Sequence, residues 1–329
     1  HTPVDTPVAP YIEATPFEWK DPTEIPRRAW IYGWHYIKSF VSGTIAPGAV
    51  GKSSLIVAEA IAIATGRALL GCKPDLSVRV WYWNGEDPAD EIRRKITATI
   101  LKHEVPPQEL EKRLFVNSGR DTEIIVAKTT RSETMVYAPV VEAVKDAIIN
   151  NNIGVFIVDP FVTCHEVTEN DNGAINQVVK AWRRIAEETG CAIELVHHSR
   201  KTNGKETTVD DSRGAVSFIS AVRSARTLNL MTREQAARLQ IEQKECRLYV
   251  RVDDGKPNLA PPENAWWFKL ESVPLGNGLI VGTDGDLVGV AVPWRWPDSA
   301  PRITSEQIHN LGIALHNFSN KAISSGVGA

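Results

Sequence analysis

Hydrophobic runs of strand length alternate with helix-like segments through the middle of the chain, from about residue 38 to residue 231. Short, continuously apolar strands separated by helices are typical of a mostly parallel sheet that is covered on both faces. The pattern therefore predicts an α/β fold with a central sheet flanked by helices. We expect strands at residues 40–45, 78–83, 114–117, 155–159, 192–197 and 225–231, and helices at residues 52–65, 88–101, 140–150, 175–189 and 215–220.

The two ends of the chain follow other patterns. The first 27 residues are rich in Pro and Thr and show little periodicity, which predicts an extended arm. Residues 247–252 and 266–271 alternate like strands, which predicts a C-terminal β extension of the same sheet. We therefore expect three parts, namely an arm at 1–27, a core domain at 28–272, and an extension of unassigned role at 273–329.

Composition excludes several classes of protein. The chain has 37 Lys and Arg against 40 Asp and Glu, and its net charge of −3 excludes a polybasic nucleic-acid coater or a cationic membrane-surface protein. Any nucleic-acid site must therefore be local. No apolar run approaches the roughly 20 residues of a membrane span. The four cysteines are dispersed, which disfavours a zinc site and favours a reducing, cytoplasmic setting.

The strongest motif lies between the first core strand and the helix that follows it, where residues 46–53 read A-P-G-A-V-G-K-S. It departs from the phosphate-binding loop G-x-x-x-x-G-K-[ST] only at Ala46. Backbone N–H groups and the helix N-terminus bind phosphate oxygens, Lys52 is expected at the β and γ phosphates, and the Ser53 hydroxyl is expected to ligate Mg²⁺. A chance turn containing G-K-S is the alternative. The residues predicted to bind the nucleotide are Pro47, Gly48, Ala49, Val50, Gly51, Lys52, Ser53 and Ser54.

Two acidic residues at predicted strand ends complete this hypothesis. Residues 155–159 read V-F-I-V-D, a buried strand that delivers Asp159 to Mg²⁺, with helix capping as the alternative. Strand 78–83 leads into N-G-E-D-P, and we expect it beside the phosphate-loop strand. Glu86 is then the predicted base that polarises the attacking water, unless it is merely solvated. Asp87 is expected to cap a helix that starts at Pro88.

A histidine pair ends the predicted strand 192–197. A histidine at a strand tip beside a phosphate site can sense the γ phosphate through a hydrogen bond. His197 and His198 are both candidates, and the sequence does not decide between them. Metal ligation by the pair is disfavoured, because adjacent residues on a strand point to opposite faces.

Two loops are candidates for a local nucleic-acid contact. The loop at 199–213 has 15 residues without apolar periodicity, a length typical of a functional loop. It has a net charge of +1, and its basic residues are Arg200, Lys201, Lys205 and Arg213. The loop at 163–172 is acidic instead, and an acidic loop repels a phosphate backbone. Its acidic residues are Glu166, Glu169 and Asp171.

Together these motifs resemble the RecA/DnaB-type P-loop ATPases, and in particular the RepA-type hexameric replicative helicases of plasmids and related AAA-family ATPases of phage and mobile elements. The resemblance covers about residues 25–270 and rests on APGAVGKSS, NGEDP, VFIVDP, LVHHS and RGAVSFISAVR. It implies a RecA-like fold, Mg²⁺-dependent ATP hydrolysis between subunits of a hexameric ring, Glu86 as catalytic base and a γ-phosphate sensor at His198. It also implies single-stranded DNA as a partner and an arginine finger from a neighbouring subunit, which Arg223 matches best.

We therefore predict an ATPase coupled to DNA replication or recombination as a helicase-like motor. The alternative is a P-loop regulatory ATPase that acts on protein partners without unwinding nucleic acid. A small-molecule phosphotransferase is disfavoured, because the sequence shows no Arg-rich lid.

Overall fold

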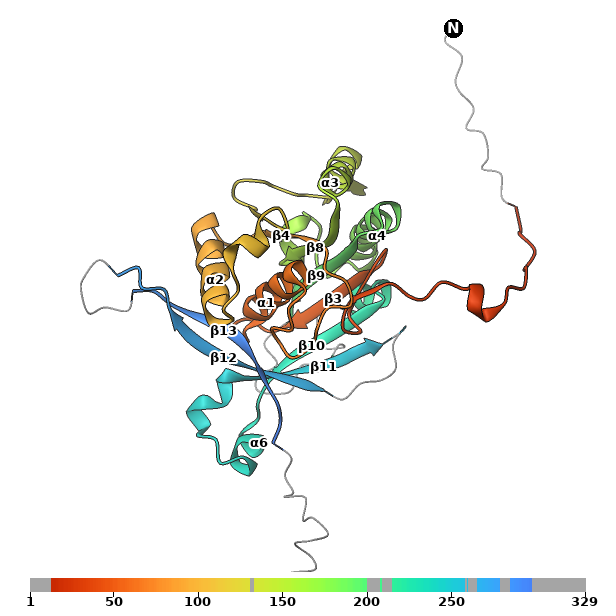
Figure 1. Cartoon of the computed structure of the whole chain (residues 1–329). Coiled ribbons are helices and arrows are strands. Elements are labelled where there is room, and N and C mark those ends of the chain that lie inside the picture. Colours follow the sequence, from red (N-terminus) through yellow and green to blue (C-terminus); the bar gives the residue numbers. More distant parts are fainter. Residues whose placement is uncertain are drawn as a thin grey trace, which may run out of the picture.

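A mostly parallel sheet forms the centre of the computed structural model, which describes residues 13–130, 133–199, 208, 215–257, 259, 265–278 and 285–297. In the described part, nine strands lie in the order β13-β12-β11-β10-β3-β9-β8-β4-β5, and the pairs from β10 to β5 are parallel (Figure 1). The predicted α/β fold is confirmed. The parallel strands are β3 (Val41–Ala46), β4 (Arg79–Asn84), β5 (Leu114–Ser118), β8 (Ile153–Asp159), β9 (Ala192–His198) and β10 (Ser224–Leu230).

Three antiparallel strands extend the sheet beyond β10, namely β11 (Tyr249–Pro257), β12 (Trp266–Pro274) and β13 (Leu287–Trp294). The predicted C-terminal β extension is therefore present, and β13 adds a strand in a region where the sequence pattern predicts none. The buried side chains of β13 occur at 288, 290, 291 and 292, so the period of two is broken. The predicted domain boundary at residue 272 falls inside β12, and the division into domains stays a prediction.

Helices cover both faces of the sheet (Figure 1). On one face, α1 (Lys52–Thr65) and α2 (Ala89–Lys102) pack on the even-numbered side chains of β4, such as Val80 and Tyr82. On the other face, Trp81 and Trp83 lie in the core beneath the remaining helices, because successive strand residues point to opposite faces. These helices are α3 (Ala138–Asn150), α4 (Asn172–Thr189) and α5 (Ala215–Ala221).

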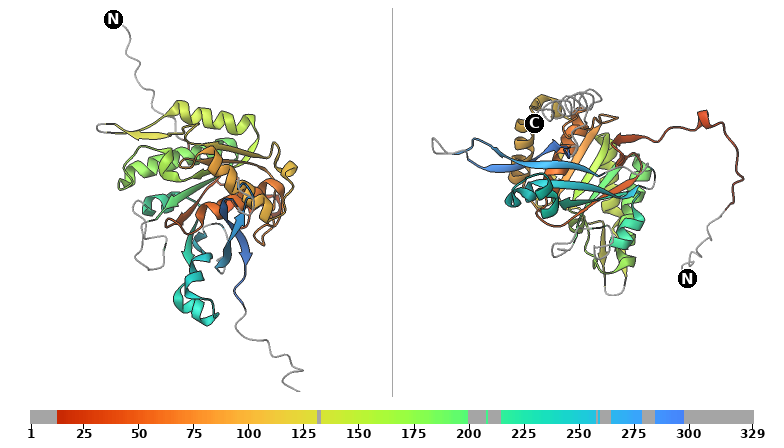
Figure 2. Two further views of the ribbon diagram at one scale, coloured as in Figure 1. Left: turned by 90° about the vertical axis from the view of Figure 1, so that its left-hand side faces the viewer. Right: turned by 90° about the horizontal axis from the view of Figure 1, so that it is seen from below.

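Short elements join the main ones. They are η1 (Pro22–Glu24), β1 (Trp30–Tyr32), β2 (Tyr36–Ile37), η2 (Pro107–Leu110), β6 (Ala127–Thr129), β7 (Thr134–Val136), η3 (Phe161–Cys164), α6 (Arg233–Arg238) and η5 (Gln243–Leu248). Residues 13–28 are exposed and leave the body as an extended segment (Figure 2). None of the helices in the described ranges is both long and apolar enough to cross a membrane.

A buried ion pair connects α1 to the sheet. Glu59 of α1 is fully buried, and the Arg226 guanidinium of β10 donates to its two carboxylate oxygens at 2.7 and 2.6 Å. The same guanidinium donates to the Thr44 hydroxyl of β3 at 2.8 Å, and the Tyr36 hydroxyl donates to Glu59 at 2.8 Å. A charge in a protein interior is tolerated when it is paired and hydrogen-bonded, and both conditions are met here.

A second buried carboxylate lies next to this pair. Glu194 of β9 accepts hydrogen bonds from the Ser42 and Thr44 hydroxyls of β3, and from His35 Nε2 at 2.9 Å. Burial opposes ionisation of Glu194, but His35 and Arg226 outweigh it and the pKa is lowered. The two carboxylates therefore connect α1, β3, β9 and β10 through one polar network.

Removal of one partner of the buried pair is expected to destabilise the fold strongly. Glu59→Gln leaves the Arg226 guanidinium buried without its counter-charge, which is expected to lower the free energy of unfolding by about 3–5 kcal/mol in a urea titration. Glu109→Gln is the matched control, because the Arg67–Glu109 pair has side chains 40% and 37% exposed and is expected to contribute little. Equal stability of the two variants would contradict the role of the buried pair.

Candidate nucleotide-binding site

The predicted phosphate-binding loop connects the end of β3 at Ala46 to the start of α1 at Lys52. Gly51 has φ +85°, and an added Cβ would lie 2.8 Å from Leu270 Cδ1 of β12. The left-handed backbone favours glycine at this position, and a larger residue would in addition displace the Leu270 side chain. No side chain caps α1 at Gly51. The unpaired N–H groups and the positive end of the helix dipole are therefore arranged as an anion site.

Lys52 lies beside two of the other predicted site residues. Its side chain is buried, and Nζ lies 3.3 Å from Nδ1 and 3.4 Å from Nε2 of His198. His198 Nε2 in turn lies 3.6 Å from a Glu86 carboxylate oxygen. Burial lowers the pKa of Lys52, against the opposing effect of Asp159 and Glu86, and burial followed by the Lys52 charge lowers the pKa of His198. The lowered pKa favours the neutral imidazole of His198, and a neutral imidazole has one nitrogen that can accept a hydrogen bond from the lysine.

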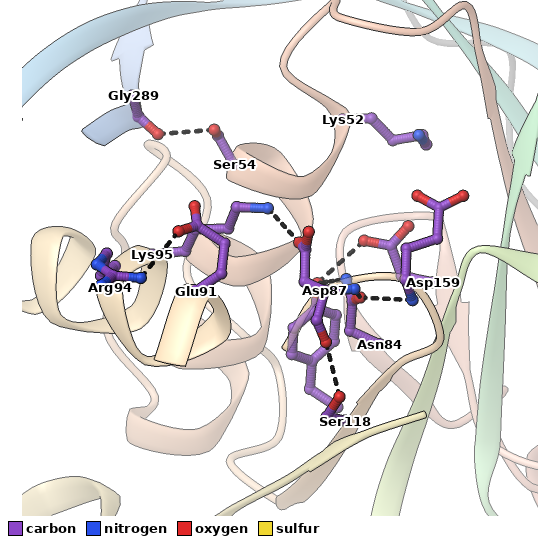
Figure 3. Close-up of polar contacts among 12 residues, drawn as sticks. Lys52, Ser54, Asn84, Asp87, Glu91, Arg94, Lys95, Ser118, Asp159 and Gly289 are labelled. Carbon is purple, nitrogen blue, oxygen red and sulfur yellow. Dashed lines mark hydrogen bonds and ion pairs between the residues drawn. The ribbon is translucent and has the colours of Figure 1, made fainter. Parts of the chain in front are cut away.

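Asp159 lies at the carboxyl end of β8 with a buried side chain. Its Oδ2 accepts a hydrogen bond from the Tyr82 hydroxyl at 3.0 Å, and Asn84 donates to the same hydroxyl at 3.0 Å (Figure 3). The alternative role of Asp159 as a helix cap is not observed, because Pro160 precedes η3 and no side chain caps it.

The oxygens at this site fit a magnesium ion. No described residue donates a hydrogen bond to Oδ1 of Asp159, and the Ser53 hydroxyl has no hydrogen-bond partner among the described residues either. Carboxylate and hydroxyl oxygens are ligands that Mg²⁺ takes, and this ion binds through one or two protein groups with substrate phosphates and waters. The described residues contain no group of three or more His, Cys, Asp or Glu side chains that could hold a metal ion.

The turn after β4 is held by Asn84. Its side-chain oxygen accepts hydrogen bonds from the N–H groups of Glu86 at 3.0 Å and Asp87 at 2.7 Å. The Gly85 N–H donates to the Asp159 carbonyl at 2.9 Å, which joins the turn to the end of β8. The Glu86 side chain remains 55% exposed and projects toward His198. Sequence reasoning missed Asn84 and Tyr82, although an Asn before a Gly turn is a known turn signal.

Two expectations about this turn are wrong. Asp87 does not cap α2, because Pro88 is the residue that precedes the helix and Ala89 begins it. The Asp87 carboxylate instead forms an ion pair of 2.5 Å with Lys95, two turns into α2 (Figure 3). Strand β4 also does not lie beside β3, because β9 and β8 lie between them, yet the turn still extends far enough to bring Glu86 to His198.

The structure places the two histidines on opposite faces of β9. His197 is buried in an aromatic cluster, with its ring centroid 5.2 Å from Phe218 and 5.7 Å from Phe161. Burial lowers the pKa of His197 to about 4. Of the two histidines, His198 is the one that contacts Lys52, while the His197 ring packs against the aromatic cluster. Among the phosphate-loop residues, Ser54 is also turned aside, since its hydroxyl donates to the Gly289 carbonyl of β13 at 2.7 Å (Figure 3).

Arg223 lies at the opposite end of the parallel strands, where β3 and β10 begin. It is exposed immediately before β10, and its N–H donates to the Val41 carbonyl at the start of β3. The carboxyl ends of the parallel strands carry Lys52, Glu86 and Asp159, so Arg223 does not meet them within one chain. The predicted nucleic-acid residues Arg200, Lys201, Lys205 and Arg213 lie outside the described residues.

The phosphate loop, the buried aspartate and the glutamate at the carboxyl edge of a parallel sheet define a P-loop ATPase domain. Residues 7–204 match the family model described as "AAA domain". This match covers more than half of the chain, and the chain belongs to that family. A solved structure described as the RadB recombinase is similar, with 12% sequence identity, a TM-score of 0.47, and coverage of 72% of this chain and 89% of that one.

The buried position of His197 predicts a pH-dependent stability. Its pKa in the folded chain lies near 4, below the ordinary value of 6.5, so the unfolded chain binds the proton first as the pH falls. The contribution of the neutral His197 to the free energy of unfolding is then complete above pH 6.5, and it is lost as the pH falls from 6.5 to 4. Between pH 7 and pH 5, the titration of His197 is expected to lower the free energy of unfolding of the wild type by about 2 kcal/mol. His197→Phe is expected not to show this part of the loss.

Urea titrations of both proteins at the two pH values measure this difference. His165 also has a pKa lowered to about 4 by burial, so part of the pH dependence is expected to remain in the variant. Identical losses in the wild type and in His197→Phe would contradict the assignment.

Proposed function

We propose that this protein hydrolyses ATP with Mg²⁺ at the carboxyl edge of its sheet. The observation that carries the proposal is the contact of Lys52 with His198 at 3.3 Å and of His198 with Glu86 at 3.6 Å, directly above the phosphate loop. A lysine, a carboxylate base and a polar sensor within reach of one phosphate group are the parts that phosphoryl transfer to water requires.

Each residue has a distinct role in this proposal. The loop amides and Lys52 hold the β and γ phosphates, and the neighbouring carboxylates favour the charged form of Lys52. Glu86 accepts a proton from the attacking water, and its exposed side chain leaves room for that water. His198 loses its contact with Lys52 when the lysine turns to the γ phosphate, and so it reports phosphate occupancy. Ser53 and Asp159 would hold Mg²⁺, which neutralises phosphate charge.

Substitution of Glu86 and Lys52 is expected to separate hydrolysis from binding. Glu86→Gln keeps the size of the side chain but removes the base, so phosphate release is expected to fall about 100-fold or more while ATP affinity is retained. Lys52→Ala is expected to lose ATP binding itself. Glu91→Gln is the matched control, because this glutamate pairs with Arg94 on α2 and lies outside the proposed site. Full turnover by Glu86→Gln would remove Glu86 from its role.

The proposed coupling to DNA rests on the resemblance and on the two loops. In the loop at 163–172, Glu166 is paired with Lys128, and Asp171 caps α4 by accepting from Gly173 and Ala174 N–H groups at 2.9 and 3.0 Å. Two of its three acidic residues thus have internal partners, which reduces the expected repulsion of a phosphate backbone. Single-stranded DNA that stimulates hydrolysis with a steep salt dependence would support a DNA motor. Hydrolysis indifferent to DNA would favour action on protein partners.

We also propose that the active form is a homo-oligomer, a hexameric ring by resemblance, in which Arg223 acts on the nucleotide of a neighbouring subunit. Its exposure and its place at the edge remote from its own phosphate loop are what an arginine supplied in trans requires. An arginine finger contributes about 10³–10⁵ in turnover.

Mixing of two inactive variants tests this arrangement. Arg223→Ala and Glu86→Gln are each expected to be inactive alone. In mixed oligomers, some interfaces combine an intact Glu86 with an intact Arg223 from the neighbour, so activity is expected to return. Mixed oligomers that form but remain inactive would reject Arg223 as the finger.

A further inference from the structure

A cavity of about 310 Å³ lies remote from the proposed nucleotide site. It is bounded by the turn between β1 and β2, by residues 70–72 after α1, and by the antiparallel strands β11, β12 and β13. The phosphate loop precedes α1, and the α1 residue that lines the cavity is Glu59, which lies seven residues, or about 10 Å along the helix, from Lys52. A ligand in this cavity would therefore not overlap a phosphate group at Lys52.

Four indole rings line the cavity, and we call it the tryptophan pocket. Trp267 is buried and packs edge-to-face against Trp294, with ring centroids 5.5 Å apart. Trp34 comes from the β1–β2 turn, and its exposure of 40% places an indole where a ligand can reach it. Trp266 is the fourth. Flat indole surfaces favour a planar aromatic ligand, because stacking on them does not require a particular substituent pattern.

The polar groups of the tryptophan pocket offer both acceptors and donors. The Asp254 carboxylate of β11 forms no hydrogen bond or ion pair with another described residue. The residue is exposed, and partial burial of its carboxylate raises the pKa against the opposing charges of His35 and Arg226. Arg226 uses three of its five N–H groups on Thr44 and Glu59, and the other two have no partner among the described residues. Arg295 adds an exposed cation at the rim.

A carboxylate acceptor and guanidinium donors beside indole walls match the edge of a nucleobase. Such a heterocycle presents ring or exocyclic N–H donors next to ring nitrogen or carbonyl acceptors, and its faces stack on aromatic rings. An organic cation would also stack on indole rings and pair with Asp254, but it would offer no acceptor to the N–H groups of Arg226 and Arg295. A site of this volume lies at the lower end of the size range of small-molecule pockets.

We propose that the tryptophan pocket is a second binding site, specific for a nucleobase, whose ligand makes no contact with the phosphate loop. The base stacks on Trp34 and donates a hydrogen bond to Asp254. It arrives either as a free nucleoside or nucleotide or as an unstacked base of a single strand. Arg226 and Glu59 line the pocket and also join α1, β3 and β10. A bound base therefore lies against elements that position the phosphate loop.

Calorimetric titration of the protein with adenosine, guanosine, cytidine and thymidine tests the proposal, because nucleosides carry no phosphate for the loop. At least one is expected to bind with a dissociation constant of about 1 mM or tighter. Trp34→Ala is expected to weaken this binding about 10-fold, as the loss of one stacking contact does. Asp254→Asn is expected to weaken it by about 10-fold as well, since a charged acceptor is lost. Trp19→Ala is the matched control, because Trp19 is 72% exposed on the arm.

Lys52→Ala separates this proposal from the proposed ATPase function. Nucleoside binding that survives Lys52→Ala and is weakened by Trp34→Ala and Asp254→Asn supports the second site, whether or not the protein hydrolyses ATP. The absence of nucleoside binding, or binding that Trp34→Ala and Asp254→Asn leave unchanged, overturns it. Displacement of the bound nucleoside by a short single-stranded oligonucleotide identifies a strand as the source of the base, and failure of displacement identifies the free nucleoside or nucleotide.

Discussion

The buried ion pair between Arg226 and Glu59 fixes the helix of the phosphate loop to the central sheet. It joins α1, the helix that begins at Lys52, to β10, and through Thr44 it reaches β3, the strand that leads into the phosphate loop. The loop therefore takes its position from a charged network inside the sheet as well as from apolar packing. Because such a pair is costly to break, it holds these three elements in one arrangement.

Parallel strands bring the site residues together from distant parts of the chain. Four different strands carry the site residues at or just after their carboxyl ends. Because these strands run in the same direction, the four residues gather at one end of the sheet; they are Lys52, Glu86, Asp159 and His198. Burial then alters their chemistry by lowering the pKa of both Lys52 and His198. The same network that fixes the loop also forms part of the floor of the tryptophan pocket, so the two sites share structural elements although their ligands differ.

Patterns within short stretches of sequence predicted those parts of the fold that are determined by residues close together in the chain. Continuous apolar runs predicted the buried parallel strands, and the glycine before Lys52 predicted the phosphate loop. Other features depend on which elements become neighbours in the folded chain. These are the contacts of Tyr82 and Asn84 near Asp159, the pairing of Asp87 with Lys95, and the position of β4 in the sheet. The tryptophan pocket likewise gathers residues more than 200 positions apart in the sequence, a separation at which periodicity carries no information.

In the proposed function, the phosphate loop and the turn at Glu86 together bind Mg²⁺ and ATP. Amide hydrogen exchange of the wild-type protein, with and without Mg²⁺ and ATP, measures this binding at each segment, because bound phosphates occupy the loop N–H groups. We expect Mg²⁺ and ATP to protect residues 47–54 and the turn at 84–88 strongly from exchange. Exchange that is unchanged in both segments while ATP is bound would contradict it.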